Sequence, residues 1–264
     1  ILDYITFNRN YENSNRCGLE RARHNVRTVR DQLPSKVWDT INSFYLWLGE
    51  QGDQRGDGYL PYSFYEQIRN HVLLFQGVTE SMMLRDNAWN FFQTGRYIER
   101  SGNTIRTLQM ICDLLVEGRT LGHVKDDYHR LLTILESVDG IEAFRRCYAD
   151  DVTIDNIAEF LVVNKNFPRS VLFSVNSLEM YIKRIQSDLD MEGYSKLNRR
   201  LGAIRLNFLA HDNFGDLTMG QHISYLNELL INGEQIGVEI GACFFYENGG
   251  EYQESTQQRK VAAI

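Results

Sequence analysis

The sequence has few of the features that break helices or build sheets. Only three of its 264 residues are proline, and runs that alternate apolar with polar residues are scarce. Because proline interrupts helices and alternation is typical of strands, this composition favours helix almost throughout. No run approaches the roughly 18 apolar residues that a membrane-spanning helix needs, and no signal peptide opens the sequence. We therefore expect a helical protein that does not enter a membrane.

A basic surface and paired cysteines are also lacking. The formal net charge is −7, which argues against general affinity for nucleic acid but is compatible with a local anion site. The four cysteines, Cys17, Cys112, Cys147 and Cys243, lie far apart and form no CxxC pair. This pattern predicts reduced, buried thiols in a reducing compartment, so we expect a cytoplasmic protein.

Motifs for cofactors and nucleophiles are missing too. Neither GxxxxGK[ST] nor GxGxxG occurs, and no serine, cysteine or histidine lies in a known nucleophile motif. One local metal candidate exists, Asp126-x-x-His129 with His123 and Asp127, but no Glu-x-x-His pairs accompany it. We therefore predict no metal and no cofactor, while leaving open whether the protein is an enzyme.

Apolar residues recur at helical spacing along most of the chain, which predicts an all-α fold. We expect a single bundle of about nine or ten helices with long central helices, spanning residues 1–246. Residues 1–7 are predicted to end an element that starts upstream, and the polar residues 247–264 to form a loose tail. The predicted helices are at about 13–32, 36–50, 61–83, 86–118, 126–138, 141–148, 153–163, 166–189, 194–211 and 218–246.

The stretch Trp89–Leu115 is the most informative part of the sequence. One side of this predicted helix carries an unbroken core stripe: Phe91, Gly95, Ile98, Gly102, Ile105, Leu108, Cys112 and Leu115. The other side is apolar at both ends and charged in the middle. A helix that is apolar nearly all round is buried, so we expect the charged middle to lie between helices. Gly95 and Gly102 are expected to let a neighbouring helix approach closely.

Five residues of that charged middle, Arg96, Glu99, Arg100, Asn103 and Arg106, are three or four positions from a neighbour and can meet on one helix side. Two interpretations fit. In the first, the arginines line an anion pocket for carboxylate or phosphate, oriented by Glu99 and Asn103. In the second, the same residues form an internal salt-bridge network that fixes how the helices pack.

The first third of the chain contains a segment that resembles part of Trp89–Leu115. Residues Glu20–Val29 and Glu99–Leu108 share the pattern E-R-x-x-x-x-[VI]-R-T-[VL], which indicates an internal repeat. The first copy adds Glu20, Arg23 and Arg27 to the anion-binding candidates, although a solvated basic face would also explain them. If the two Glu-Arg helices face each other, both clusters could share one cavity.

Several phrases resemble the alpha-E domain family, an α-helical family named for its Glu-Arg motif. The resemblance is carried by Gly95–Arg100 with Asn103, Thr104 and Arg106, and by residues 22–32, 74–79, 142–146 and 167–171. It implies an all-α fold, a bacterial cytoplasmic origin, and genomic association with circularly permuted ATP-grasp ligases and transglutaminase-like proteins. Family members usually begin with another Glu-Arg helix, so we expect such a helix upstream of Ile1.

The resemblance and the charged residues lead to one expected function and two alternatives. We expect an accessory or substrate-binding domain that works with an ATP-grasp-type amide or peptide ligase, or with a transglutaminase-like protein, and binds an acidic or phosphate-bearing ligand. The first alternative is an enzyme with Glu99 as acid/base, clamped by the arginines. The second is a structural module that binds other proteins and has no small-molecule site.

Overall fold

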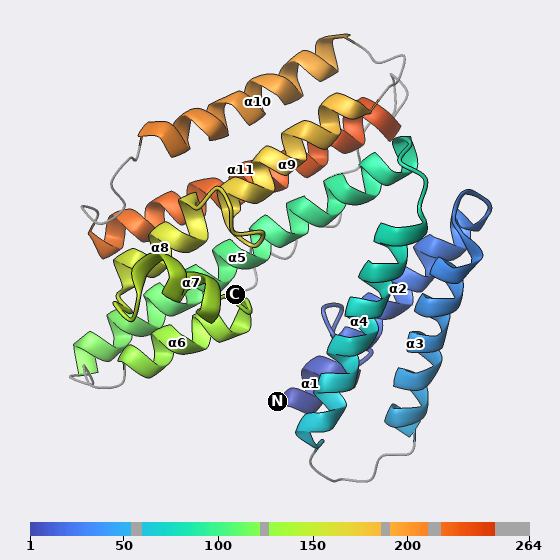
Figure 1. Cartoon of the computed structure of the whole chain (residues 1–264), viewed down its shortest axis with the longest axis horizontal. Helices are drawn as coiled ribbons and strands as arrows, with labels where there is room; N and C mark the ends of the chain where they lie inside the picture. Colours follow the sequence, from blue (N-terminus) through green and yellow to red (C-terminus); the bar gives the residue numbers. More distant parts are fainter. Residues whose placement is uncertain (54–59, 122–126, 186–190, 211–217, 246–264) are drawn as a thin grey trace. The chain divides into compact units, whose positions relative to one another are not determined.

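The computed structural model describes residues 1–53, 60–121, 127–185, 191–210 and 218–245, which are helical almost throughout (Figure 1). These residues form eleven α-helices and one 3-10 turn and contain no strand, so the predicted all-α class is confirmed. The helices are α1 (Leu2–Phe7), α2 (Asn15–Thr28), α3 (Ser35–Asp53), α4 (Tyr62–Met82), α5 (Asn87–Leu121), α6 (Asp127–Ser137), α7 (Ile141–Tyr148), α8 (Ile154–Val163), α9 (Val171–Arg184), α10 (Met191–Ala210) and α11 (Met219–Phe245), with the turn η1 at Arg30–Gln32. None of the described helices is both long enough and apolar enough to cross a membrane.

The chain divides into two compact units, Ile1–Trp89 and Asn90–Ile264, which we call the first and second units. Each has its own hydrophobic core. The expectation of one domain over residues 1–246 stays a prediction, and the expected tail at 247–264 lies outside the described residues.

The first unit contains helices α1 to α4. Its core gathers one side of each helix around the buried side chains Phe7, Leu19, Ile41, Phe44, Leu48 and Phe64. The Ser14 side chain caps α2 by accepting a hydrogen bond from the Cys17 backbone N–H over 3.2 Å. α2 then stops at Thr28, earlier than predicted, because Arg30–Gln32 tighten into a separate turn before Pro34.

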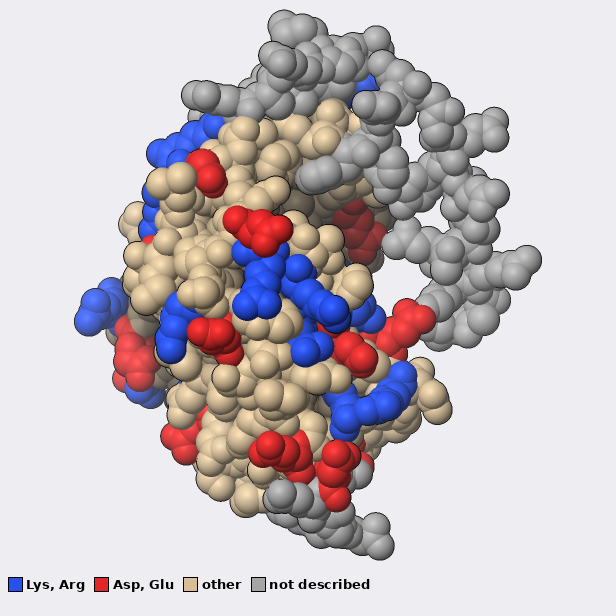
Figure 2. All heavy atoms as spheres, turned by 90° about the vertical axis from the view of Figure 1, so that its right-hand side faces the viewer, with Lys and Arg blue, Asp and Glu red and all other residues tan. Residues whose placement is uncertain are grey.

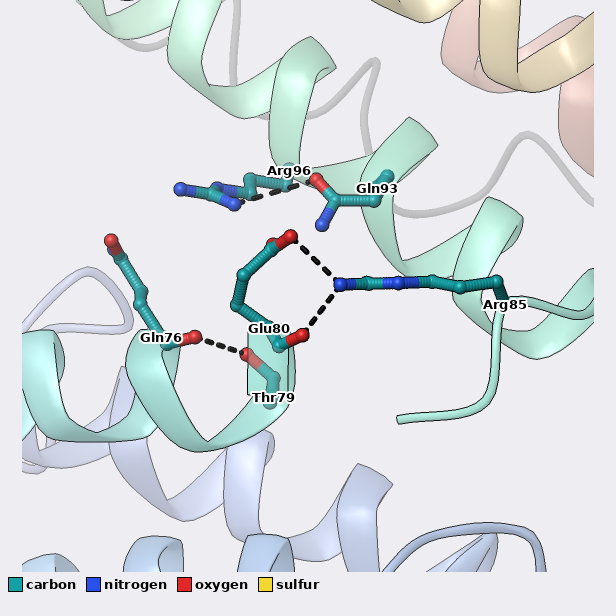
Figure 3. Close-up of polar contacts among 6 residues, drawn as sticks. All are labelled: Gln76, Thr79, Glu80, Arg85, Gln93 and Arg96. Carbon is teal, nitrogen blue, oxygen red and sulfur yellow. Dashed lines mark hydrogen bonds and ion pairs between the residues drawn. The ribbon is translucent and has the colours of Figure 1, made fainter. Parts of the chain in front are cut away.

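An arginine closes the end of α4 (Figure 3). Arg85 Nη2 donates to the Glu80 carbonyl over 2.5 Å and to the Glu80 carboxylate over 2.8 Å. The Arg85 guanidinium carbon also lies 3.6 Å from the centre of the Trp89 ring. One side chain thus satisfies a carbonyl that the helix end leaves open and packs on the first turn of α5.

The second unit contains most of α5 and the helices α6 to α11. α5 is flanked by α9 and α11, through the stacked pair Tyr97 and Tyr181 and the edge-on pair Phe91 and Phe244 (Figure 1). The core of this unit is built on the fully buried side chains Ile105, Leu108, Ile134, Leu135, Phe144, Ile157, Phe160, Leu161 and Ile182. Burying an aliphatic or aromatic side chain stabilises the fold by about 1.5–3 kcal/mol each, so this core dominates the stability of the unit.

One predicted helix start in this unit is wrong. α9 begins at Val171 and not at about residue 166, because Ser170 is buried and caps the helix by accepting from the Phe173 N–H over 3.1 Å. The chain just before it forms a turn, in which the Ser170 backbone N–H donates to the Phe167 carbonyl over 3.0 Å. Of the cysteines predicted to be buried, Cys112 is buried as expected, but Cys147 is exposed at the end of a short surface helix.

Candidate functional site

Two hydrogen bonds join the middle of α5 to the segment in front of α9. Arg100 Nη1 donates to the Pro168 carbonyl over 3.2 Å, and the Thr104 hydroxyl donates to the Arg169 carbonyl over 2.8 Å. The partners are 68 and 65 positions apart in the chain. The two stretches that carry much of the family resemblance, around 95–106 and 167–171, therefore meet in the second unit.

Three guanidinium groups gather at this junction. Burial lowers the pKa of Arg100, and the positive charges of Arg96 and Arg169 lower it further, against an opposing effect of Tyr97. The guanidinium carbons of Arg100 and Arg96 lie 5.4 Å and 6.0 Å from the centre of the Tyr97 ring. Like charges held this close destabilise one another, and a bound anion would relieve the repulsion. We call Arg96, Arg100 and Arg169 the α5 arginine cluster.

Each member of the α5 arginine cluster is held in a different way. Arg96 is half-buried and donates from Nη1 to Gln93 Oε1 over 3.4 Å (Figure 3). Arg169 forms an ion pair with Asp139 at 3.1 Å. Arg100 is half-buried, and within the described residues it contacts a carbonyl but no carboxylate. Arg100 is thus the member whose charge an anion would compensate most directly.

The rest of the charged middle is not buried, and this part of the prediction is wrong. Glu99, Asn103 and Arg106 are exposed, because the helix side that they share faces solvent. Arg106 donates to the Asn103 side chain over 3.2 Å and lies 3.7 Å from the Glu234 carboxylate of α11. Glu99 makes no hydrogen bond or ion pair with any described residue, so it takes no part there in the expected salt-bridge network.

The expected close approach of a helix at Gly95 and Gly102 is also wrong. A Cβ atom at Gly95 would meet no described atom within 4 Å. At Gly102 it would meet only the Arg106 guanidinium, 3.2 Å away on the same helix. These glycines therefore leave room beside α5 that no described helix occupies.

The candidates on α2 lie in the first unit. Arg23 is half-buried, and its Nε donates to Asn42 Oδ1 over 2.8 Å, whereas Glu20 and Arg27 are exposed. Arg23 belongs to the first unit and Arg100 to the second. A cavity shared by the two clusters stays a prediction.

The structure gives the two Glu-Arg pairs a common feature. Arg21 Nη2 donates to the Glu12 carbonyl over 2.7 Å, as Arg100 does to the Pro168 carbonyl. Each accepting carbonyl lies two positions before a serine that caps a helix, Ser14 for α2 and Ser170 for α9. The arginine of each pair thus anchors the chain in front of a helix start.

Sequence reasoning did not identify Arg169 or Tyr97 as site residues. Arg169 lay within a phrase that carried the resemblance, and Tyr97 lay between two predicted site arginines. These sequence positions were the signal that could have identified Arg169 and Tyr97 as site residues. What could not be predicted is that α9 begins late enough for the Pro168–Arg169 backbone to reach α5.

No metal site is formed by the described residues, because they contain no group of three or more His, Cys, Asp or Glu side chains able to hold an ion. Of the sequence candidate, His123 and Asp126 lie outside those residues, whereas Asp127 and His129 lie within them.

Comparison with known proteins gives one match. The family model of Alpha-E, described as a predicted alpha-helical domain with a conserved ER motif, matches residues 1–245. No curated protein and no solved structure matches the chain.

Proposed function

The chain belongs to the Alpha-E family, and from this premise we propose that it is an accessory or substrate-binding helical domain that recognises an anionic group. The proposed binding residues are the α5 arginine cluster. The proposed partner is an ATP-grasp-type amide or peptide ligase in the bacterial cytoplasm, because the family resemblance implies that association. A transglutaminase-like protein is the second partner that the resemblance implies.

One observation carries the proposal of an anion site. Arg100 is half-buried beside two other guanidinium groups, and within the described residues no carboxylate pairs with it. A desolvated cation that lacks a counter-charge is costly, and arginine offers a planar fork that fits carboxylate or phosphate. Binding an anion here would supply the missing charge and stabilise the cluster.

The ligand class follows from the geometry of the donors. The Pro168 carbonyl holds one nitrogen of Arg100, which leaves its other N–H groups for a second acceptor. The Tyr97 ring, stacked 5.9 Å from Tyr181, forms an aromatic surface beside these donors. We therefore propose a ligand that ends in a carboxylate or phosphate, such as the acidic end of a peptide to be joined by the ligase.

Glu99 has little to support a role as acid/base. It is exposed, and it contacts no arginine among the described residues. A general acid or base is usually held in place by neighbouring groups, and Glu99 lacks such neighbours there.

Calorimetric titration of the full chain with inorganic phosphate and with a short peptide ending in glutamate tests the proposal. Arg100→Gln and Arg169→Gln should each weaken binding by roughly tenfold or more, since a charge-assisted hydrogen bond is worth about 1.5–3 kcal/mol. Arg145→Gln is the matched control, because Arg145 is an exposed arginine of the same unit that pairs with Asp150 at 3.0 Å.

Thermal melting separates binding from stability. If Arg100→Gln melts like the wild type and has lost its ligand, the anion site is supported. If wild-type protein binds neither probe and Arg100→Gln only lowers the melting temperature, the arginines serve packing and the proposal is wrong. The partner is tested by co-purification with an ATP-grasp-type ligase from the same source, and no association would refute that part.

A further inference from the structure

A regular row of arginines lies where α2 packs against α3 in the first unit. Its members are Arg16 and Arg23 on α2 and Arg30 in the turn η1, each seven positions from the next. We call them the arginine row. Arg16 and Arg23 lie on the same side of α2, because residues seven apart share one side of an α-helix, and Arg30 lies just beyond the end of α2.

The facing positions on α3 are also seven apart. They are Trp38, Tyr45 and Gly52. The guanidinium carbon of Arg30 lies 5.2 Å from the centre of the Trp38 ring, and that of Arg23 lies 4.6 Å from Tyr45 and 5.2 Å from Trp38.

The third pair of the row is Arg16 and Gly52. Arg16 Nη1 lies 3.0 Å from where a Cβ atom of Gly52 would be. Two of the three arginines thus lie over aromatic rings of α3, and the third lies beside its glycine.

No member of the arginine row forms an ion pair in the described part of the chain. Arginines elsewhere pair with carboxylates, as Arg106 does with Glu234, Arg145 with Asp150 and Arg200 with Glu239. None of the three row members makes such a pair, and residues 15–28 contain four arginines but one carboxylate, Glu20. On the face drawn in Figure 2, basic and acidic side chains lie side by side.

The guanidinium groups of Arg23 and Arg30 are also held in place before any ligand binds. Asn42 accepts from Nε of Arg23 over 2.8 Å, and the aromatic rings support the planes of Arg23 and Arg30. Stacking on a ring uses the face of a guanidinium and leaves its N–H edge for a carboxylate. Groups that are already ordered lose less entropy when a ligand binds.

The spacing of the row selects the kind of ligand. The facing positions lie on one continuous helix, α3, where seven residues span about 10.5 Å, so a second helix with a carboxylate at every seventh position would follow the arginines at the same period. In an extended strand, side chains alternate between two faces at steps of about 3.3 Å and do not match this period. We propose that the arginine row binds an acidic helix of a partner protein, with Glu or Asp repeated every seven residues. This inference does not rest on the function proposed for the α5 arginine cluster.

Fluorescence anisotropy with the full chain tests this inference. The probe is a labelled helical peptide of three heptads with glutamate at every seventh position, compared with an isomer in which the same glutamates are moved out of that period. The in-register peptide should bind more tightly, and the double variant Arg16→Gln/Arg30→Gln should weaken it by roughly five- to tenfold, since each exposed ion pair contributes modestly. Binding should also weaken as salt is added.

Arg21→Gln is the matched control, because it removes the same charge from α2 but lies off the row, where Arg21 donates to the Glu12 carbonyl. It should bind the in-register peptide like the wild type, and circular dichroism should show that all variants remain folded. Equal binding of the two peptides, no binding of either, or tighter binding of sodium polyphosphate would each overturn the proposal.

Discussion

At the scale of single residues, one arginine can decide how a distant segment is placed. Arg100 reaches across 68 positions to the Pro168 carbonyl, and Arg21 makes the same type of bond to Glu12. A Glu-Arg pair on a helix predicts charge pairing, but here the arginine of each pair donates to a backbone carbonyl. Such a contact cannot be predicted from spacing, because every residue type has a backbone carbonyl and the sequence does not show which one accepts the bond.

Gly52 offers a sharp test of packing at one position. A Cβ atom there would lie 3.0 Å from Arg16 Nη1 and 3.1 Å from the Phe7 ring, and Phe7 is part of the core. We expect Gly52→Ala to lower the free energy of unfolding by about 1–3 kcal/mol through overpacking. Urea denaturation measures the change.

Gly49 is the matched control for that variant, since it lies on the same helix and a Cβ atom there would meet nothing within 4 Å. Gly49→Ala should be stabilising by about 0.5–1 kcal/mol, as expected for alanine within a helix. If both substitutions stabilised the protein equally, the close contact at Gly52 would be wrong.

The buried thiol of Cys112 should make stability depend on alkaline pH. Burial, with a smaller effect of Asp113, raises its pKa from 9.0 to about 11. Between these values the unfolded chain loses the proton first, so the unfolded state is favoured as the pH rises. We expect a loss on the order of 2 kcal/mol between pH 9 and 11, because each pKa unit corresponds to about 1.4 kcal/mol.

Urea denaturation at several pH values checks this expectation. Cys112→Ala should show a shallower fall in the free energy of unfolding over that range, even if it is less stable throughout. Cys147→Ala removes an exposed thiol and should keep the wild-type slope. Identical slopes in all three proteins would contradict the assignment.

At the scale of helices, capping chemistry explains which boundaries could be predicted. The start and end of α8 match the prediction, since Thr153 caps the helix and accepts from the Asn156 N–H over 3.2 Å. The start of α9 does not, because Pro168 and Ser170 both signal a helix start and only the structure shows that Ser170 is used. The sequence also did not predict that Glu99 and Arg106 are exposed. A helix rich in apolar residues can still leave part of one side uncovered.

Removing the cap of α9 should lower the stability of the protein. Ser170 is fully buried, accepts from the Phe173 N–H and donates to the Asn164 carbonyl over 2.5 Å. Ser170→Ala should cost about 2–3 kcal/mol, because it removes a cap and leaves buried groups without partners. Thr153→Ala, at an exposed cap, should cost about 1 kcal/mol. Thermal melts of the two variants give the comparison, and equal losses would speak against a special role for Ser170.

At the scale of the whole molecule, the two units have separate cores. Leu48 is buried in the core of the first unit and Leu161 in that of the second. We expect Leu48→Ala to reduce the protection of α3 amides from hydrogen exchange by about 2–5 kcal/mol, and Leu161→Ala to do the same for α8. Mass spectrometry of exchanged peptides would locate the losses. A uniform loss over both units in either variant would show that they unfold as one.

The shared period of the arginine row and its partners on α3 has a consequence for how this protein can change. An inserted or deleted residue between Arg16 and Arg23 would rotate everything beyond it by about 100° and shift it by about 1.5 Å. Arg16 would then lose its alignment with Arg23 and Arg30, although every side chain would still be present. Relatives that keep the row should therefore tolerate substitutions along α2 far more readily than changes in its length, whereas insertions should accumulate before Ser14 or after Asp53.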